Sequence, residues 1–440
     1  MSDVREDGAR NELSRALVAG FRSHPERSAA IGEIHSRPQP MLPVPRTLIQ
    51  LAFSTEGGAV VDAAVIAELC RKHALSAPER AARHCTFRLP NGNLYWERHS
   101  EFSTYLWEAP PAGARHWKIG SPFDVGFNPP GTVMSGVRLE ILQLDPNASP
   151  PSLGLDPESV CHALVEDGNA EILTDFRQDA DGLTRIFVID RGLNEIRRGA
   201  LAQRLIEIET YRVFCMLGLS LAQVLSGHLR RLEADVAQLT SEIRRGGRDE
   251  SERLLARLTD LAAELEAQAA SSLFRFGASR AYYDIVLERL DALKEVPIEG
   301  AASWSQFLAR RVAPAMRTCR SVEDRQANLS RKISRTTQLL RTWVDVEVER
   351  QNRDLLASMN DRARQQLRLQ QTVEGLSVAA ISYYVVGLIS YLLNGLPPLL
   401  GLNLPKYTAG LAVPFVILVV WLLVRRIRRR HDESGSTGLA

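Results

Sequence analysis

Histidine and carboxylate side chains alternate in one short stretch of the sequence. Glu97, His99 and Glu101 stand two residues apart, and alternate residues of a β-strand point to the same face of a sheet. A row of carboxylate, imidazole and carboxylate could hold a divalent ion or exchange protons, because histidine titrates near neutral pH. A solvated strand face with cross-strand ion pairs is the alternative. The opposite face would carry Trp96, Arg98 and Phe102.

The same alternation occurs nearer the N-terminus, at Glu33, His35 and Arg37. These residues lie in a polar arm, residues 1–45, which ends in a proline cluster that favours an extended path. If the arm pairs beside the strand that carries His99, the two rows form one polar site. The candidate ligand-binding residues are therefore Glu33, His35, Arg37, Glu97, Arg98, His99 and Glu101.

Templates for catalysis and metal binding are absent from the sequence. It contains no G-x-x-x-x-G-K-[ST], G-x-S-x-G or H-E-x-x-H motif. Its five cysteines are far apart and form no C-x-x-C pair. We therefore expect no enzyme activity, no catalytic residues, no metal and no cofactor. Glu209 and Arg212, three residues apart on an expected helix, favour a structural ion pair over a catalytic set.

Composition narrows the class of protein. Of the 440 residues, 45% are hydrophobic and 24% are charged, which excludes a wholly disordered chain. A net charge of +2 argues against a nucleic-acid partner, because such binders are usually strongly basic. The charged N-terminus lacks the apolar core of a signal peptide, so we expect most of the chain in a reducing cytoplasm.

Residues 46–192 carry the strand signals of one α+β domain with a mainly antiparallel sheet. Asn91-Gly92 predicts a hairpin, because both residues tolerate positive φ. Runs of strand-forming residues predict strands at 47–54, 85–89, 94–107, 131–144, 170–177 and 184–189, and helical spacing predicts a helix at 59–73. After Gly192, apolar residues three and four apart predict helices at 194–225, 227–243, 251–293 and from 303 onward.

The helical and stalk region, residues 193–372, ends in a long apolar stripe. Spacings of four dominate, which is closer to an 11-residue repeat than to a heptad. Such a stripe needs a partner, either the preceding helices of the chain or copies from other subunits. Its members are Leu329, Ile333, Leu340, Val344, Val348, Leu355, Met359, Ala363 and Leu367.

Residues 373–425 predict two membrane spans, at about 375–396 and 407–424. No residue from 375 to 405 is charged, and each span is long enough to cross a hydrocarbon core of about 30 Å as a helix. Arginines flank both outer ends, whereas the loop between the spans carries only Lys406. The positive-inside rule then places both termini in the cytoplasm, with residues 426–440 as a basic, disordered tail.

Several motifs resemble a bacterial family of membrane-anchored proteins, the domain of unknown function 3422. They occur in order along most of the chain, and the resemblance implies the same domain order and membrane anchoring but no activity. The motifs are HPER (24–27), EIHSRP (33–38), WERHSEFSTY (96–105), RLIEIETYR (204–212), FGASRAYY (276–283), RRVAPAMRTC (310–319) and the span at 373–392.

The order of parts also resembles that of CorA-type divalent-cation channels. These channels carry a Gly-Met-Asn signature at the outer end of the first span, and the nearest match here is Gly401-Leu402-Asn403. The middle residue differs, and a proline pair precedes the match. If the chain is a channel, the resemblance places Gly401 and Asn403 at the outer mouth of its pore.

The sequence predicts an α+β cytoplasmic domain, then long α-helices and a C-terminal transmembrane hairpin. We expect a homo-oligomeric sensor or scaffold tethered to the bilayer of the bacterial inner membrane, with no nucleic-acid partner. A CorA-like cation channel is the alternative. An enzyme that uses Glu97, His99 and Glu101 ranks last.

Overall fold

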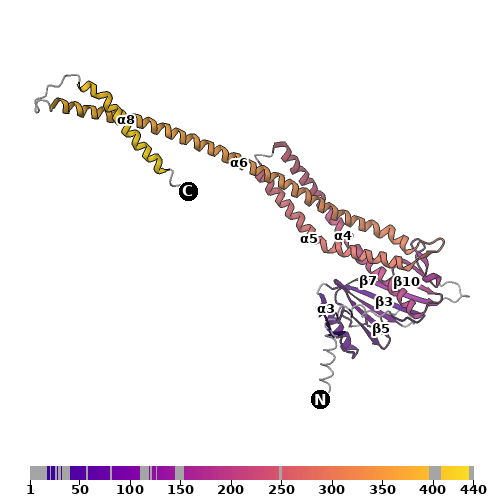
Figure 1. The fold of residues 1–440 in the computed structure, drawn as a ribbon. Helices are drawn as coiled ribbons and strands as arrows, with labels where there is room; N and C mark the ends of the chain where they lie inside the picture. The colour runs from indigo at the N-terminus through magenta and orange to yellow at the C-terminus, as the bar shows by residue number, and fades with distance from the viewer. Residues whose placement is uncertain are drawn as a thin grey trace, which may run out of the picture. The chain divides into compact units, whose positions relative to one another are not determined.

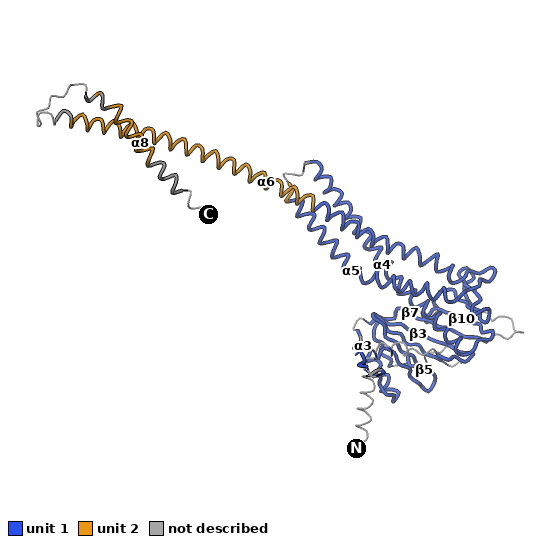
Figure 2. The backbone as a smooth tube through the Cα atoms, viewed as in Figure 1, with its two compact units in different colours: residues 1–247, 253–337 blue, residues 248–252, 338–440 orange. Residues whose placement is uncertain are grey.

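The computed structural model divides into two compact units (Figure 2). Unit 1 comprises residues 1–247 and 253–337, and unit 2 comprises residues 248–252 and 338–440. The residues that the structure describes are 17–19, 21–24, 27, 31, 40–55, 58–79, 82–109, 118, 121–124, 126–143, 153–246, 250–395 and 408–435.

A nine-stranded mixed sheet forms the centre of unit 1, in the order β11-β8-β9-β10-β7-β3-β6-β5-β4. The β10–β7 pair is parallel, and the other neighbouring strands are antiparallel. A separate ribbon pairs β1 (Leu17–Val18) with β2 (Phe21–Arg22). The strands of the sheet are β3 (Arg46–Ser54), β4 (His84–Leu89), β5 (Gly92–Arg98), β6 (Phe102–Ala109), β7 (Thr132–Gln143), β8 (Cys161–Val165), β9 (Ala170–Gln178), β10 (Thr184–Asp190) and β11 (Val296–Pro297).

The mixed sheet confirms the predicted class of the N-terminal domain, but two strands were not expected. β8 precedes the 3-10 turn η1 (Glu166–Gly168), and β11 follows the second long helix and pairs with β8. The predicted hairpin between β4 and β5 is confirmed, but its two turn residues are Pro90 and Asn91, because Gly92 already pairs with Leu89. The predicted strand 94–107 is wrong as one element, since it divides into β5 and β6.

Each face of the sheet has its own apolar core, because successive strand residues point to opposite faces. On one face, Leu48, Phe102 and Leu139 pack with Leu205 and Phe214 of α4 (Glu195–Gly246), which contacts β7 and β10 (Figure 1). On the other face, the helix α3 (Gly58–Lys72) contributes to a second core. This second core includes Ile49, Ile66, Trp96, Tyr105 and Trp107.

Three long helices continue the first core: α4, α5 (Ser251–Leu293) and the first part of α6 (Trp304–Gly395). Ion pairs show that α5 runs antiparallel to α4, because early residues of one helix pair with late residues of the other. These pairs are Arg289–Glu207, Arg231–Glu264 and Arg257–Glu242. Arg280–Glu323 joins α5 to α6 in the same antiparallel sense.

From Leu308 to Leu340, buried residues of α6 alternate between spacings of four and three, with the polar residues Gln326 and Thr336 at two of the positions. This is the heptad pattern of helices that pack at a shallow angle. Residues 329–340 alone, with spacings of four, three and four, fit a heptad and an 11-residue repeat equally, so the predicted repeat stays a prediction. Leu340 is the last fully buried member of this series. The buried apolar members are Leu308, Val312, Ala315, Cys319, Val322, Leu329, Ile333 and Leu340.

Unit 2 contains the rest of α6 from Gln338 onward, together with α8 (Thr408–Gly435). Ser382 of α6 and Val416 and Val420 of α8 are buried. Most of the other side chains described in this unit are exposed.

Two helices among the described residues are long and apolar enough to cross a membrane, Glu195–Arg245 and Trp304–Leu392. In the first, 33% of the most apolar window is buried inside the protein, and Leu205, Ile208 and Phe214 of this helix belong to the sheet core. In the second, only 6% of the window is buried. Packing on the sheet thus covers a third of this window in the first helix and almost none of it in the second.

Candidate functional site

A cavity of about 110 Å³ lies between α4 and the strands β3, β4, β5 and β6 of unit 1. Its wall combines apolar side chains with amide, hydroxyl, imidazole and carboxylate groups. This mixture is typical of small-molecule sites, in which a few polar groups orient a ligand against an apolar surface. The lining residues are Pro40, Leu48, Gln50, His84, Cys85, Thr86, Tyr95, Trp96, Glu97, His99, Phe102, Thr104, Leu106, Gln203, Ile206, Glu207, Thr210 and Tyr211.

The helical wall of the cavity is held in place by hydrogen bonds. Gln50 Nε2 of β3 donates to Thr210 Oγ1 of α4 at 2.8 Å. Glu207 accepts a hydrogen bond from Gln203 Nε2 at 2.9 Å and pairs with Arg289 Nε at 2.6 Å. The Glu207 carboxylate is thereby fixed at the wall, with its charge partly balanced by α5.

Tyr95 of the strand wall belongs to a second polar group, whose other members are not lining residues of the cavity. Tyr95 Oη donates to Glu108 Oε2 at 3.2 Å, and Asn93 Nδ2 donates to the same oxygen at 2.8 Å. Burial and the Glu108 charge raise the pKa of Tyr95 to about 12, so its phenol is protonated at neutral pH. Arg46 Nε lies 3.4 Å from Glu108 Oε1, so its positive charge partly balances the Glu108 carboxylate.

The predicted row of Glu97, His99 and Glu101 does not exist as a strand face. β5 ends at Arg98, and the backbone N–H of His99 donates to the carbonyl of Phe102 at 2.8 Å, which closes a tight turn before β6. The turn ends the alternation, so the predicted common face of Trp96 and Phe102 is also wrong. Trp96 belongs to the α3 core and Phe102 to the α4 core.

Two of the three row residues still meet at the cavity. His99 Nε2 lies 3.9 Å from Glu97 Oε1, and the imidazole stacks on the Phe102 ring with centroids 4.2 Å apart. His99 also makes an edge contact with Tyr211 of α4, at 6.3 Å between centroids. Among the described residues, no group of three or more histidine, cysteine or carboxylate side chains is arranged to hold a metal ion.

Glu101, the third residue of the row, joins the turn to α5. Its carboxylate pairs with Arg275 through both oxygens, at 3.1 and 2.5 Å, and accepts a hydrogen bond from Tyr282 Oη at 2.7 Å. Burial and this hydrogen bond raise the pKa of Tyr282. Glu101 is therefore a structural anchor outside the cavity wall.

Of the other predicted site residues, the structure describes only Arg98. Arg98 ends β5 and is not among the residues that line the cavity. The arm residues Glu33, His35 and Arg37 lie outside the described residues, as do Gly401 and Asn403.

The residues of α4 were missed as a site because each of them also fits an ordinary helix. The sequence pattern that could have identified them is a run of polar residues on one face of the helix, at positions 203, 207, 210 and 211, beside Ile206. The predicted ion pair of Glu209 and Arg212 is confirmed, with Arg212 Nη2 at 2.6 Å from Glu209 Oε1. Thr184 Oγ1 of β10 donates to the same oxygen at 2.8 Å, so this pair fastens α4 to the sheet.

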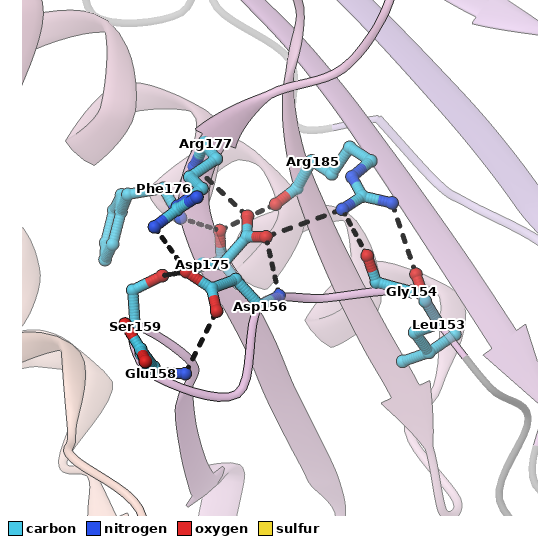
Figure 3. A network of polar contacts seen from close by, with 10 residues as sticks. Leu153, Gly154, Asp156, Glu158, Ser159, Asp175, Phe176, Arg177 and Arg185 are labelled. Atoms are coloured by element: carbon cyan, nitrogen blue, oxygen red, sulfur yellow. Dashed lines mark hydrogen bonds and ion pairs between the residues drawn. The ribbon is translucent and has the colours of Figure 1, made fainter.

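A separate polar network fixes the segment before β8 (Figure 3). Asp175 Oδ2 of β9 accepts from the backbone N–H of Asp156 at 3.1 Å and lies 3.4 Å from Arg185 Nη2. Arg185 also donates to the carbonyls of Leu153 and Gly154, at 3.2 and 2.7 Å. Because these charges bind backbone groups and one another, the network is structural.

Together, these features define a protein with a mixed-sheet domain, a cavity beneath its first long helix, and a later long helix whose apolar window is almost entirely uncovered. The chain belongs to the family described as "Protein of unknown function (DUF3422)", whose model matches residues 22–431. No curated protein matches the chain.

Proposed function

We propose that the chain is a membrane-anchored sensor whose sheet domain binds a small molecule in the cavity beneath α4. The single observation that carries this proposal is the cavity itself, because most of a sheet–helix interface is close-packed. Here hydroxyl, amide and carboxylate groups face a shared space of about 110 Å³. The chain binds its ligand without chemical conversion.

The charges of the wall favour a ligand that combines a cationic group with an apolar body. Among the described lining residues there are two carboxylates, Glu97 and Glu207, and neither lysine nor arginine. A positive group between them gains electrostatic energy in a partly dry site. Leu48, Leu106 and Ile206 offer apolar contact to the remainder of the ligand.

Membrane anchoring is supported by the exposed apolar part of α6. Residues 375–395 of this helix carry no charge, and only 6% of its most apolar window is buried. α8 supplies the return span and continues into Arg425 and Arg426. The proposal places both termini in the cytoplasm of a bacterium, with the two spans in its inner membrane.

Self-association through α6 is part of the proposal. Beyond Leu340, Val348, Leu355 and Met359 are 50%, 61% and 57% exposed. Their spacings follow the 11-residue repeat of a nearly straight or slightly right-handed coiled coil. Copies held in one membrane run parallel, so each presents the same stripe at the same depth.

Filling the cavity tests the binding proposal. Thr104 lines the cavity and is 8% exposed, so Thr104→Trp should block a ligand. The purified full-length chain would be screened by thermal shift against aromatic and aliphatic amines, with matched carboxylates. We expect amines to raise the Tm of the wild type but not of Thr104→Trp.

The control is Arg88→Trp, which places a tryptophan on β4 at an exposed position outside the lining residues. This variant should respond to amines like the wild type. An equal Tm response of Thr104→Trp and the wild type would refute the cavity as the binding site.

A divalent-cation channel is the second candidate function. One observation favours it: α6 is a single helix that begins among the buried helices at Trp304 and ends in the apolar segment at Gly395. Magnesium-dependent flux into liposomes that contain the full-length chain would support the channel. Protein-free liposomes are the control, and equal flux in both would exclude it.

A further inference from the structure

A basic groove lies between α5 and α6 in unit 1, apart from the sheet cavity. It encloses about 130 Å³. Arg280 of α5 faces it from one side, and Arg317 and Arg320 of α6 face it from the other. Glu323 is the one carboxylate among the described residues that line it.

The charges of this groove are not balanced. Arg280 Nη1 pairs with Glu323 Oε2 at 2.8 Å, which uses the available carboxylate. Arg317 and Arg320 are exposed, and within the described part of the chain neither forms an ion pair or hydrogen bond. Like charges three or four residues apart on a helix repel by a few tenths of a kcal/mol. An anion between the two guanidinium groups would remove this repulsion.

The floor of the groove is apolar and aromatic. Phe276 is 2% exposed, and Met316 is partly buried beside it. Tyr283 borders the same space, and burial raises the pKa of its phenol, which therefore remains a hydrogen-bond donor at neutral pH. A ligand that fits this surface has a flat apolar part next to its anionic group.

We propose that the α5–α6 groove binds a small phosphate monoester with an aromatic group, the phosphate lying between Arg317 and Arg320. Guanidinium groups bind phosphate oxygens through paired, charge-assisted hydrogen bonds. The aromatic part contacts Phe276 and Met316. This site is independent of the cavity beneath α4, and its ligand carries the opposite charge.

Isothermal titration of the purified full-length chain in mild detergent tests the proposal. The probes are phenyl phosphate, inorganic phosphate and phenol. We expect phenyl phosphate to bind more tightly than inorganic phosphate or phenol. Only phenyl phosphate has both a phosphate for the arginines and a ring that contacts the apolar floor of the groove. Equal affinities for inorganic phosphate and phenyl phosphate would overturn the aromatic part of the inference.

Three arginine substitutions and one cavity-filling substitution locate the site. Arg317→Gln and Arg320→Gln should each weaken phenyl phosphate binding about 10-fold, the usual effect of losing one charge-assisted contact. Arg335→Gln removes an exposed arginine elsewhere on α6 and should leave binding unchanged. Thr104→Trp, which fills the other cavity, should also bind phenyl phosphate like the wild type.

Two outcomes would overturn the inference. Unchanged binding in Arg317→Gln and Arg320→Gln would place phenyl phosphate elsewhere. An equal loss in Arg335→Gln would show attraction to overall positive charge and no defined site. Circular dichroism spectra that match the wild type would confirm that these exposed substitutions leave the fold intact.

Discussion

Tyr105 Oη of β6 donates a hydrogen bond of 2.7 Å to Asp62 Oδ1 of α3, although Asp62 is 0% exposed. The same carboxylate accepts from Ser103 Oγ at 2.9 Å and from Trp96 Nε1 at 3.1 Å. Burial and the Asp62 charge raise the pKa of Tyr105, so the phenol stays protonated. Three neutral donors thus satisfy one buried acid and fix α3 to the sheet.

Replacing Asp62 should strongly destabilise unit 1. Asp62→Ala leaves three buried donors without an acceptor, and each unsatisfied group costs about 1–3 kcal/mol. We expect the free energy of unfolding to fall by about 3 kcal/mol or more, measured by urea denaturation. Asp284→Ala, at an exposed position of α5, is the control and should change it by less than about 0.5 kcal/mol. Similar losses in the two variants would contradict this account.

Glu101→Gln should release the turn after β5 from α5. The change weakens the paired contact with Arg275 and the hydrogen bond from Tyr282. We expect a loss of about 1–3 kcal/mol in the free energy of unfolding, because a half-buried charge loses its partner. Glu264→Gln breaks an exposed pair with Arg231, and its cost should stay below about 1 kcal/mol. The prediction fails if the two substitutions cost the same.

Acid should weaken the sheet through Glu171 of β9. Burial would raise the pKa of this carboxyl, but hydrogen bonds from His162 and Arg191 outweigh it, and the pKa is lowered from 4.5. A lowered pKa gives stability that is present above pH 4.5 and is lost as pH falls through the folded-state value. Urea denaturation from pH 7 to pH 3 should show this loss in the wild type, with a shallower slope in Glu171→Gln. Identical slopes would exclude a contribution from Glu171.

Charges in the apolar stripe of α6 should separate the subunits. Leu355→Glu with Met359→Glu places two carboxylates on the face where we expect copies to meet. Mass measurement in detergent should then show a lower mass than for the wild type. Leu356→Glu is the control, because Leu356 is equally exposed, at 63%, but lies on another face of the helix. A wild-type protein that is already a monomer would contradict the expected association.

Helical spacing and strand composition predicted most elements because they report local preferences. Two helices were expected, at 194–225 and 227–243, with a break at Ser226, yet α4 continues through Ser226 and Gly227. A glycine inside a helix costs only about 1 kcal/mol. The buried Leu225, Leu229 and Leu232 supply more than that by packing in the bundle.

The site was only partly predictable, because its walls come from distant segments. Glu97 and His99 were identified from their residue types, and both line the cavity. The turn at 99–101 removed Glu101 from this group, since composition alone does not show where a strand ends. Gln203 and Glu207 were missed because their role depends on how α4 crosses the sheet.

Pro40 and Gly199 show how the cavity is closed at its margin. Pro40 lines the cavity, and a Cβ on Gly199 would meet the Pro40 carbonyl oxygen at 1.7 Å. Arg198 holds the same segment by donating to the Leu42 carbonyl. The cavity therefore forms only after chain segments about 160 positions apart have met. A fragment that ends at residue 192 would lack the helix that covers this cavity and would expose one apolar face of its sheet to solvent.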